Sequence, residues 1–390
     1  MAPPPREADL WRLWARASPG WGFLPASDGH RYRVLYPGRL NRAAGPDFRD
    51  ALLLRGDGRL LRGDVEVHLS PQGWDDHGHT ADPRYRGVLL HLVAAEAPPS
   101  PSTPPQVALA ALLRPTAEGE TPPFVGALPS LTLLHRWADA LFRRRARGWM
   151  PVLAREGLDQ ALYLGVMEGL GYAANRLPMR RLAEALPYRR VRHIALPYGP
   201  GERPLALSAL LLGAGGLLAP EDPLTPLWRA AGVEPPLERG AWSRVGVRPA
   251  NRPERRLRGM ALLLDRFWES GLAGGLLPRV REGPGAVEAA LVTPSPWGGP
   301  ALVGSARARE IAVSVVLPVA WGWAVAQGDG ALRRAAWGCW KAFPPPPDNA
   351  LTRSLKALLP APLPPSARLQ QGLLAWARRL GGIPLGEARR

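Results

Sequence analysis

The sequence predicts an α+β protein with an N-terminal mixed β-sheet followed by a mainly α-helical, C-terminal region. Up to about residue 125, short apolar runs alternate with turn signals such as Asp57-Gly58, a pattern typical of strands and hairpins. From about residue 128, apolar side chains recur at helical spacing. We therefore expect a mixed-sheet domain over 1–125 and a helical, arginine-rich domain over 126–390.

In the first region, a short amphipathic helix over 8–17 precedes the strands. The expected strands cover 32–38, 46–56, 59–69, 87–96 and 107–113, separated by loops that include the proline-rich stretch 97–106 and residues 114–123. The pair 46–56 and 59–69 carries the best hairpin signal. Strand 87–96 is apolar enough to be central in a sheet. The segment 70–85 is too broken by Gly, Pro and Asp for a regular helix.

The second region alternates amphipathic segments with Gly and Pro stops. Helices are expected within 131–149, 158–172, 178–187, 242–268 and 369–382, with a rigid proline linker over 341–350 before the last one. No internal repeat is visible.

Composition excludes several protein classes. The one cysteine, Cys339, rules out an internal disulfide framework and a four-cysteine zinc site. The chain start lacks the basic-then-apolar pattern of a signal peptide. The apolar runs 205–219 and 311–326 are shorter than the roughly 20 residues that span a bilayer. We expect buried core segments, a cytoplasmic location and no membrane partner.

The charge favours an anionic partner. The net charge is +17, and all but two of the 50 basic residues are arginines. A GC-rich genome accounts for the arginine preference but not for the excess, and nucleic acid is the usual partner of such a protein. Residues 1–100 carry a net charge of +1 (13 basic, 12 acidic), which leaves +16 for the rest. Candidate phosphate-binding arginines are Arg143, Arg144, Arg147, Arg248, Arg255 and Arg256.

The hairpin carries the candidate chemical site. Strand side chains alternate, so Glu66 and His68 share one face while Val65 and Val67 face the other. A turn at Asp57-Gly58 brings Asp47 back near Glu66. Two carboxylates beside a proton-handling group are what a divalent metal needs for phosphodiester cleavage. Asp47, Glu66 and His68 are therefore the candidate catalytic residues.

This arrangement resembles the PD-(D/E)xK nuclease motif: Pro46-Asp47, 18 intervening residues, then Glu66-Val67-His68. The resemblance implies a restriction-endonuclease-like hairpin core with Asp47 and Glu66 as metal ligands. The motif places a lysine where this chain has His68.

Three more histidines lie close by in the sequence. His77 and His79 form a His-x-His in a loop, and His91 lies on strand 87–96. Histidine is the commonest nitrogen ligand of transition metals, so these residues join Asp47 and Glu66 as candidate metal ligands. His91 alone is more often a core histidine, and the acids of the loop are more often turn or cap residues.

The runs GPDF, GDVEVH, WDDHGH and LLH together are similar to a bacterial family known only as a domain of unknown function. The resemblance adds Asn41, Trp74, Asp82 and Tyr85 as signature positions, and it assigns them no roles.

The leading hypothesis is a metal-dependent nuclease-like enzyme with Mg²⁺ or Mn²⁺, Zn²⁺ being possible. One alternative is a histidine-bound Zn, Fe or Mn hydrolase or oxidoreductase acting on a small molecule. A second is a non-enzymatic protein that binds nucleic acid.

Overall fold

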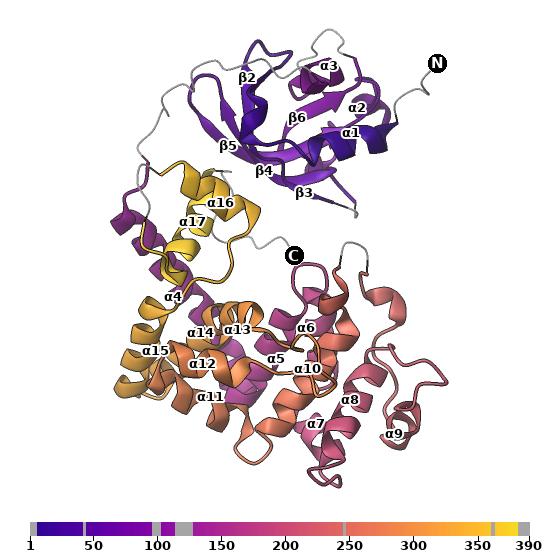
Figure 1. Cartoon of the computed structure of the whole chain (residues 1–390), viewed down its shortest axis with the longest axis vertical. Coiled ribbons are helices and arrows are strands. Elements are labelled where there is room, and N and C mark those ends of the chain that lie inside the picture. The colour runs from indigo at the N-terminus through magenta and orange to yellow at the C-terminus, as the bar shows by residue number, and fades with distance from the viewer. Residues whose placement is uncertain are drawn as a thin grey trace. The chain divides into compact units, whose positions relative to one another are not determined.

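The computed structural model describes residues 6–41, 44–95, 103–113, 128–244, 247–359 and 363–380. In these residues seven strands form one mixed sheet (Figure 1). The strands are β1 (Phe23–Pro25), β2 (Arg31–Tyr36), β3 (Arg39–Leu40), β4 (Phe48–Arg55), β5 (Leu60–Val67), β6 (Val88–Val93) and β7 (Gln106–Ala108). The helical region follows, so the predicted α+β class is confirmed.

The sheet has the order β1-β2-β4-β5-β6-β7, with β3 paired to β4. Strands β1, β2, β4 and β5 are antiparallel neighbours, whereas β5–β6 and β6–β7 are parallel pairs. A parallel pair needs a crossover connection. The crossover from β5 to β6 spans residues 68–87 and carries the histidine loop, so the loop is held beside both strands.

The predicted hairpin is β4–β5, closed at Asp57-Gly58. Its register shifts between Phe48 and Ala51, where Asp50 adopts a positive φ of 65°. The buried carboxylate of Asp64 accepts a hydrogen bond from the Asp50 backbone N–H at 3.0 Å. The bulge therefore has a side-chain partner, and it bends the start of β4 where Asp47 lies.

One face of the sheet packs on the N-terminal helix α1 (Glu7–Trp14) and on α3 (Leu109–Leu113). Leu10 and Trp14 of α1 join Val65 and Val67 of β5 in the core of this region. Val65 and Val67 thus point away from Glu66 and His68, as the alternation predicts. The expected strand over 107–113 was wrong in part, since β7 ends at Ala108 and the chain continues as α3.

The helical region has its own core, centred on α5 and α8. Its helices are α4 (Leu131–Glu156), α5 (Leu158–Leu170), α6 (Arg176–Ala185), α7 (Tyr188–Ala195), α8 (Arg203–Ala214), α9 (Thr225–Ala230), α10 (Pro253–Arg266), α11 (Gly271–Glu282), α12 (Pro284–Leu291), α13 (Ser305–Ile311), α14 (Leu317–Ala326) and α15 (Gly330–Ala342). The predicted stop of α5 at Gly171 is confirmed by its cap position.

Two compact units divide the chain. The first comprises Met1–Trp137, Asp348–Leu363 and Gly372–Arg390, and the second comprises Ala138–Pro347 and Pro364–Gln371. Helix α16 (Ala350–Ala357) belongs to the first unit, where Ser354 donates a hydrogen bond to the Leu35 carbonyl of β2 at 2.7 Å. The final helix, α17 (Ala367–Leu380), contributes to both units. The division at residue 125 does not include this return of the chain to the sheet.

One helical segment is longer than the sequence indicated. Helix α13, the π-helical turn Ala312–Val316 and α14 form a continuous helix over Ser305–Ala326, 22 residues long. Its length and apolar character match those of a membrane span, but 67% of its most apolar window is buried inside the protein. It is therefore a core helix, and the cytoplasmic location stays a prediction. The loops expected at 97–102 and 114–123 lie outside the described residues.

Candidate metal centre

In the crossover after β5, His77 and His79 lie in the turn that ends a short helix. The short helix α2 (Gly73–Asp76) ends with hydrogen bonds from the His79 N–H to the Trp74 carbonyl (3.1 Å) and from the Gly78 N–H to the Asp75 carbonyl (2.9 Å). This pair of bonds is a Schellman motif, which requires a left-handed residue. Gly78 supplies it with φ 65°. The His-Gly-His sequence is thus a structural stop that reverses the chain between two imidazoles.

His68 follows the last residue of β5 and is held at both ring nitrogens. Its Nδ1 lies 2.8 Å from Nε2 of His91, and its Nε2 lies 3.1 Å from Nδ1 of His77. Helix α2 approaches the ring closely at Gly73, where a Cβ would lie 2.8 Å from His68 Cγ. Glycine at position 73 is therefore what allows the crossover to pack against this imidazole.

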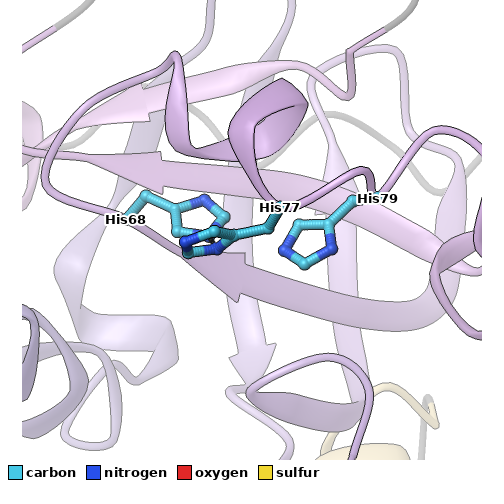
Figure 2. Close-up of side chains that lie close together, drawn as sticks. All are labelled: His68, His77 and His79. Atoms are coloured by element: carbon cyan, nitrogen blue, oxygen red, sulfur yellow. Dashed lines mark hydrogen bonds between the residues drawn. The ribbon is translucent and has the colours of Figure 1, made fainter.

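His68, His77 and His79 form the candidate ligand set. One nitrogen from each lies within 4.8 Å of the others, and Figure 2 shows the three rings turned toward a common region. A tetrahedral ion with bonds of about 2.0–2.1 Å requires its ligand atoms about 3.3 Å apart. The pair His68–His77 already meets this value. His77 is exposed, so its side chain can move inward. The group can hold a metal ion.

Unpartnered nitrogens agree with this role. Among the described residues, both ring nitrogens of His79 and Nδ1 of His91 are buried without a hydrogen-bond partner. Buried polar atoms usually have partners, and an unpartnered one calls for an explanation such as a missing ion. The ring of His79 stacks on Tyr85 with centroids 3.7 Å apart. A metal ion would satisfy one of its nitrogens.

Burial favours the neutral form of His68, His79 and His91, the form in which histidine binds a metal ion. Burial and the neighbouring imidazoles lower the pKa of His68 to about 3, and burial lowers the pKa of His91 to about 4. The pKa of His79 is also lowered by burial. His91 is entirely buried and lies outside the group of three, but it contacts one member of that group, His68. It is therefore placed to fix the tautomer of a ligand, the usual task of an outer-shell partner.

Glu66 lies against the histidines. Its Oε1 is 3.4 Å from His79 Nε2 and 3.7 Å from His68 Nε2, while its Oε2 accepts a hydrogen bond from the Asp47 backbone N–H at 2.9 Å. Burial and the charge of Asp47 raise the pKa of Glu66 to about 8. The carboxyl is thus held at the edge of the histidine group with one oxygen fixed by backbone.

Asp47 is close to Glu66, as the hairpin predicts, but its Oδ2 has other partners. It accepts hydrogen bonds from the Trp11 indole at 3.0 Å and from the Val67 N–H at 3.2 Å. Burial raises the pKa of Asp47 to about 6, against the effect of these bonds. In the described residues Asp47 and His91 stand outside the group of three histidines.

The remaining signature residues hold the loops around the site. Trp74 donates to Thr80 Oγ1 at 2.9 Å, and its ring contacts those of Tyr85 and His91. Asp82 caps the turn Pro83–Tyr85 by accepting from the Arg84 N–H. Asn41 donates to the carbonyls of Gly45 and Pro46, which shapes the loop before Asp47. Trp74 and Tyr85 thus contact the ring of His79, whereas Asp82 and Asn41 shape the adjoining loops.

Sequence reasoning missed the contribution of α1. Trp11 holds Asp47, and the charge of Glu7 raises the pKa values of both Asp47 and Glu66. Glu7 and Trp11 are four residues apart, so they share a helix face. The sequence signal for this contribution was the position of Glu7 and Trp11 beside the apolar face of α1 that Leu10 and Trp14 form.

The candidate arginines occupy different environments. Arg143, Arg147 and Arg248 are exposed, Arg144 is half-buried, and half-buried Arg255 donates to the Pro300 carbonyl. Arg256 is instead buried, with 4% of its surface exposed, and it donates to the Leu302 carbonyl, the Tyr172 hydroxyl and Asn251 Oδ1. Because its guanidinium bonds three internal groups, Arg256 does not present it at the surface, where a phosphate would have to bind.

Comparisons with known proteins match part of the chain to a family of unknown function. Residues 7–106 match the family model described as "Protein of unknown function (DUF2851)", which covers α1, the sheet to the start of β7, and the whole histidine cluster. No curated protein and no solved structure gives a significant match. The resemblance to PD-(D/E)xK nucleases therefore stays a prediction. The part of the chain that carries the candidate metal centre is therefore similar to a domain family of unknown function.

Proposed function

We propose that the N-terminal unit is a transition-metal-dependent hydrolase that cleaves phosphodiesters. The observation that carries the proposal is the group His68, His77 and His79, whose nitrogens face one another beside a carboxylate. A catalytic metal site typically has three protein ligands and an open position for water. A metal ion bound there would activate water and polarise a phosphoryl oxygen.

The ligand type selects the metal. Imidazole nitrogens suit Zn²⁺, Fe²⁺ and Mn²⁺, whereas Mg²⁺ prefers carboxylate, carbonyl and water oxygens. Three histidines therefore favour a transition metal over the Mg²⁺ that a pair of carboxylates would hold. Zn²⁺ is our first choice, since the 3.1 Å separation of His68 Nε2 and His77 Nδ1 suits a tetrahedral ion.

Each neighbouring residue then has a task. His68 would donate its Nδ1 proton to Nε2 of His91, 2.8 Å away, and would then offer its Nε2 lone pair to the ion. Glu66, with Oε1 beside two of the ligands, would accept a proton from a water on the ion once its own carboxyl is ionised. Asp47, in turn, holds Glu66 through its backbone N–H.

The charge of the protein supports a phosphodiester substrate. A net charge of +17 raises the local concentration of polyanions. The metal group alone is equally compatible with the hydrolysis of other esters, so the choice of nucleic acid rests on this charge.

The test is hydrolysis of bis(p-nitrophenyl) phosphate and of an oligonucleotide. Protein stripped with a chelator is reloaded with Zn²⁺, Mn²⁺ or Mg²⁺, and wild type is compared with His77→Ala. We expect cleavage with a transition metal and a loss of at least about 100-fold in the variant, since even outer-shell partners account for about 10–100-fold. His77 is exposed, so the variant should fold.

The control is His30→Ala, which removes an exposed histidine of the same unit outside the cluster. It should retain wild-type cleavage. Equal cleavage by His77→Ala and wild type would reject the histidine site. Cleavage supported by Mg²⁺ alone and lost in Asp47→Asn would instead favour the two-carboxylate nuclease.

A further inference from the structure

The helical unit contains a surface hollow lined by arginines and tryptophans. It has a volume of about 230 Å³ and is bounded by Arg143 of α4, Trp321 of α14, and Arg333, Arg334 and Trp337 of α15. The three arginines are exposed and the two tryptophans half-buried. All five residues belong to the second compact unit, whereas the histidines of the cluster belong to the first.

The two tryptophans of the hollow pack against a buried phenylalanine. The rings of Trp321 and Trp337 both make edge-to-face contacts with the ring of Phe142, with centroid distances of 6.2 and 5.5 Å. Phe142 is fully buried and also stacks on Trp340. The two indoles therefore have little freedom to rearrange, and a ligand that stacks on them pays little ordering entropy.

The positive charge of the hollow is uncompensated. In the part of the chain that the structure describes, Arg143, Arg333 and Arg334 form no ion pair with an acidic side chain. Two acids of the neighbouring helices have other cations as partners: Asp139 pairs with Arg368, and Asp329 with Arg281. Arg143 lies over the Trp337 ring at 4.9 Å, which leaves its guanidinium edge free to donate.

We propose that this hollow binds a nucleotide, either free or as one unit of a single strand. The guanidinium groups of Arg333 and Arg334 bind the phosphate, and the indoles of Trp321 and Trp337 take the base. Guanidinium forks match phosphate oxygens, and bases stack on aromatic side chains in a sequence-tolerant way.

The size and lining of the hollow argue for this ligand. Pockets for drug-sized molecules are about 300–1,000 Å³, so a hollow of about 230 Å³ suits a ligand with one planar group. A solvated arginine surface with no ligand does not account for two tryptophans that are held in place by a buried phenylalanine. A purely apolar ligand would not need three unpaired cations.

The test is fluorescence anisotropy with a short labelled oligodeoxythymidylate, in the presence of a chelator so that no metal contributes. The variant is the double change Arg333→Ala and Arg334→Ala, which alters two exposed side chains. The control, Arg189→Ala with Arg190→Ala, removes the same charge from two exposed arginines of α7. Adenosine monophosphate as competitor then separates the two sources of the ligand.

We expect the variant to bind at least tenfold more weakly than the control. The slope of log affinity against log salt should fall by about 0.7, because the two arginines contact one phosphate and each phosphate contact to a single strand contributes about 0.7. Displacement by adenosine monophosphate identifies a free nucleotide as sufficient, whereas its failure assigns the site to a strand. Equal binding by variant and control would overturn the proposal, as would an abasic strand that binds as tightly as the oligodeoxythymidylate.

These outcomes do not depend on the metal centre. Loss of cleavage in His77→Ala should leave strand binding unchanged, and the double arginine variant should still bind the metal ion.

Discussion

Gly73→Ala should weaken metal binding through a single methyl group. The added Cβ would lie 2.8 Å from His68 Cγ and 3.0 Å from its Cδ2, whereas ordinary contacts begin near 3.4 Å. The ring must therefore retreat by about 0.6 Å at its near edge, the difference between these values. It cannot do so freely, because its two nitrogens are held by His91 and His77.

A displacement of this size exceeds what a metal site tolerates. Ligand distances in such sites hold to within about 0.2 Å, so a shift of about 0.6 Å removes one good bond. We expect the Zn²⁺ affinity to fall by about 10–100-fold, as it does when an outer-shell partner is lost. The measurement is a competition titration of metal-free protein and Zn²⁺ against a chelating dye.

Gly20→Ala is the matched control. Gly20 lies in the same unit, its φ is not positive, and an added Cβ would meet nothing closer than 3.8 Å. This variant should bind Zn²⁺ as the wild type does. If Gly73→Ala also binds Zn²⁺ with wild-type affinity, His68 is not a ligand and the reasoning fails.

Three further predictions concern buried groups. His91→Gln should lower Zn²⁺ affinity by about 10–100-fold in the same titration, because His68 loses the partner that fixes its tautomer; unchanged affinity would remove His91 from the site. In metal-free protein, Glu66→Gln should stabilise the fold against urea at pH 8.5 but not at pH 4.5. The folded pKa of Glu66, about 8, is above its ordinary value of 4.5, so its stability contribution is complete at low pH and is lost as pH rises. The gain in the free energy of unfolding has an upper limit of about 5 kcal/mol, because the pKa rises from 4.5 to about 8 and each pKa unit corresponds to about 1.4 kcal/mol. The absence of any gain at pH 8.5 would refute this prediction. Burial raises the pKa of Cys339 to about 12, so native protein should resist a thiol reagent at pH 9 and react fully once unfolded; fast native reaction would contradict this.

Local patterns in the sequence predicted the parts of the fold that depend on neighbours along the chain. The Asp57-Gly58 turn and the alternation at Val65, Glu66 and Val67 define the hairpin and its two faces. The central position of β6 followed from its apolar character. These features need only strand geometry and turn chemistry, which act over a few residues.

The site itself depends on contacts between distant segments. His68 meets His77 only because α2 stops at Gly78 and passes close at Gly73. The sequence around these two glycines does not predict that contact. Asp47 gains Trp11 from α1, 36 residues away in the sequence, and this indole occupies one of its two carboxylate oxygens. Proximity of Asp47 and Glu66 was predictable, whereas the direction of each carboxylate was not.

The arginines show a similar limit. Arg255 and Arg256 are adjacent and look equivalent in the sequence. Their helix α10 presents one near the surface and buries the other against Tyr172 and Leu302. Conversely, Arg333 and Arg334 follow no long basic run, yet they share a hollow with two tryptophans. Charge counts identify a partner class, but packing decides which cations remain available.

X-ray absorption spectroscopy of the protein loaded with one equivalent of Zn²⁺ tests the central claim most directly. The account predicts three imidazole nitrogens at about 2.0–2.1 Å with one further light ligand, and the loss of one imidazole in His77→Ala. An ion surrounded by oxygen ligands, or a spectrum that His77→Ala and His79→Ala leave unchanged, would contradict the three-histidine centre.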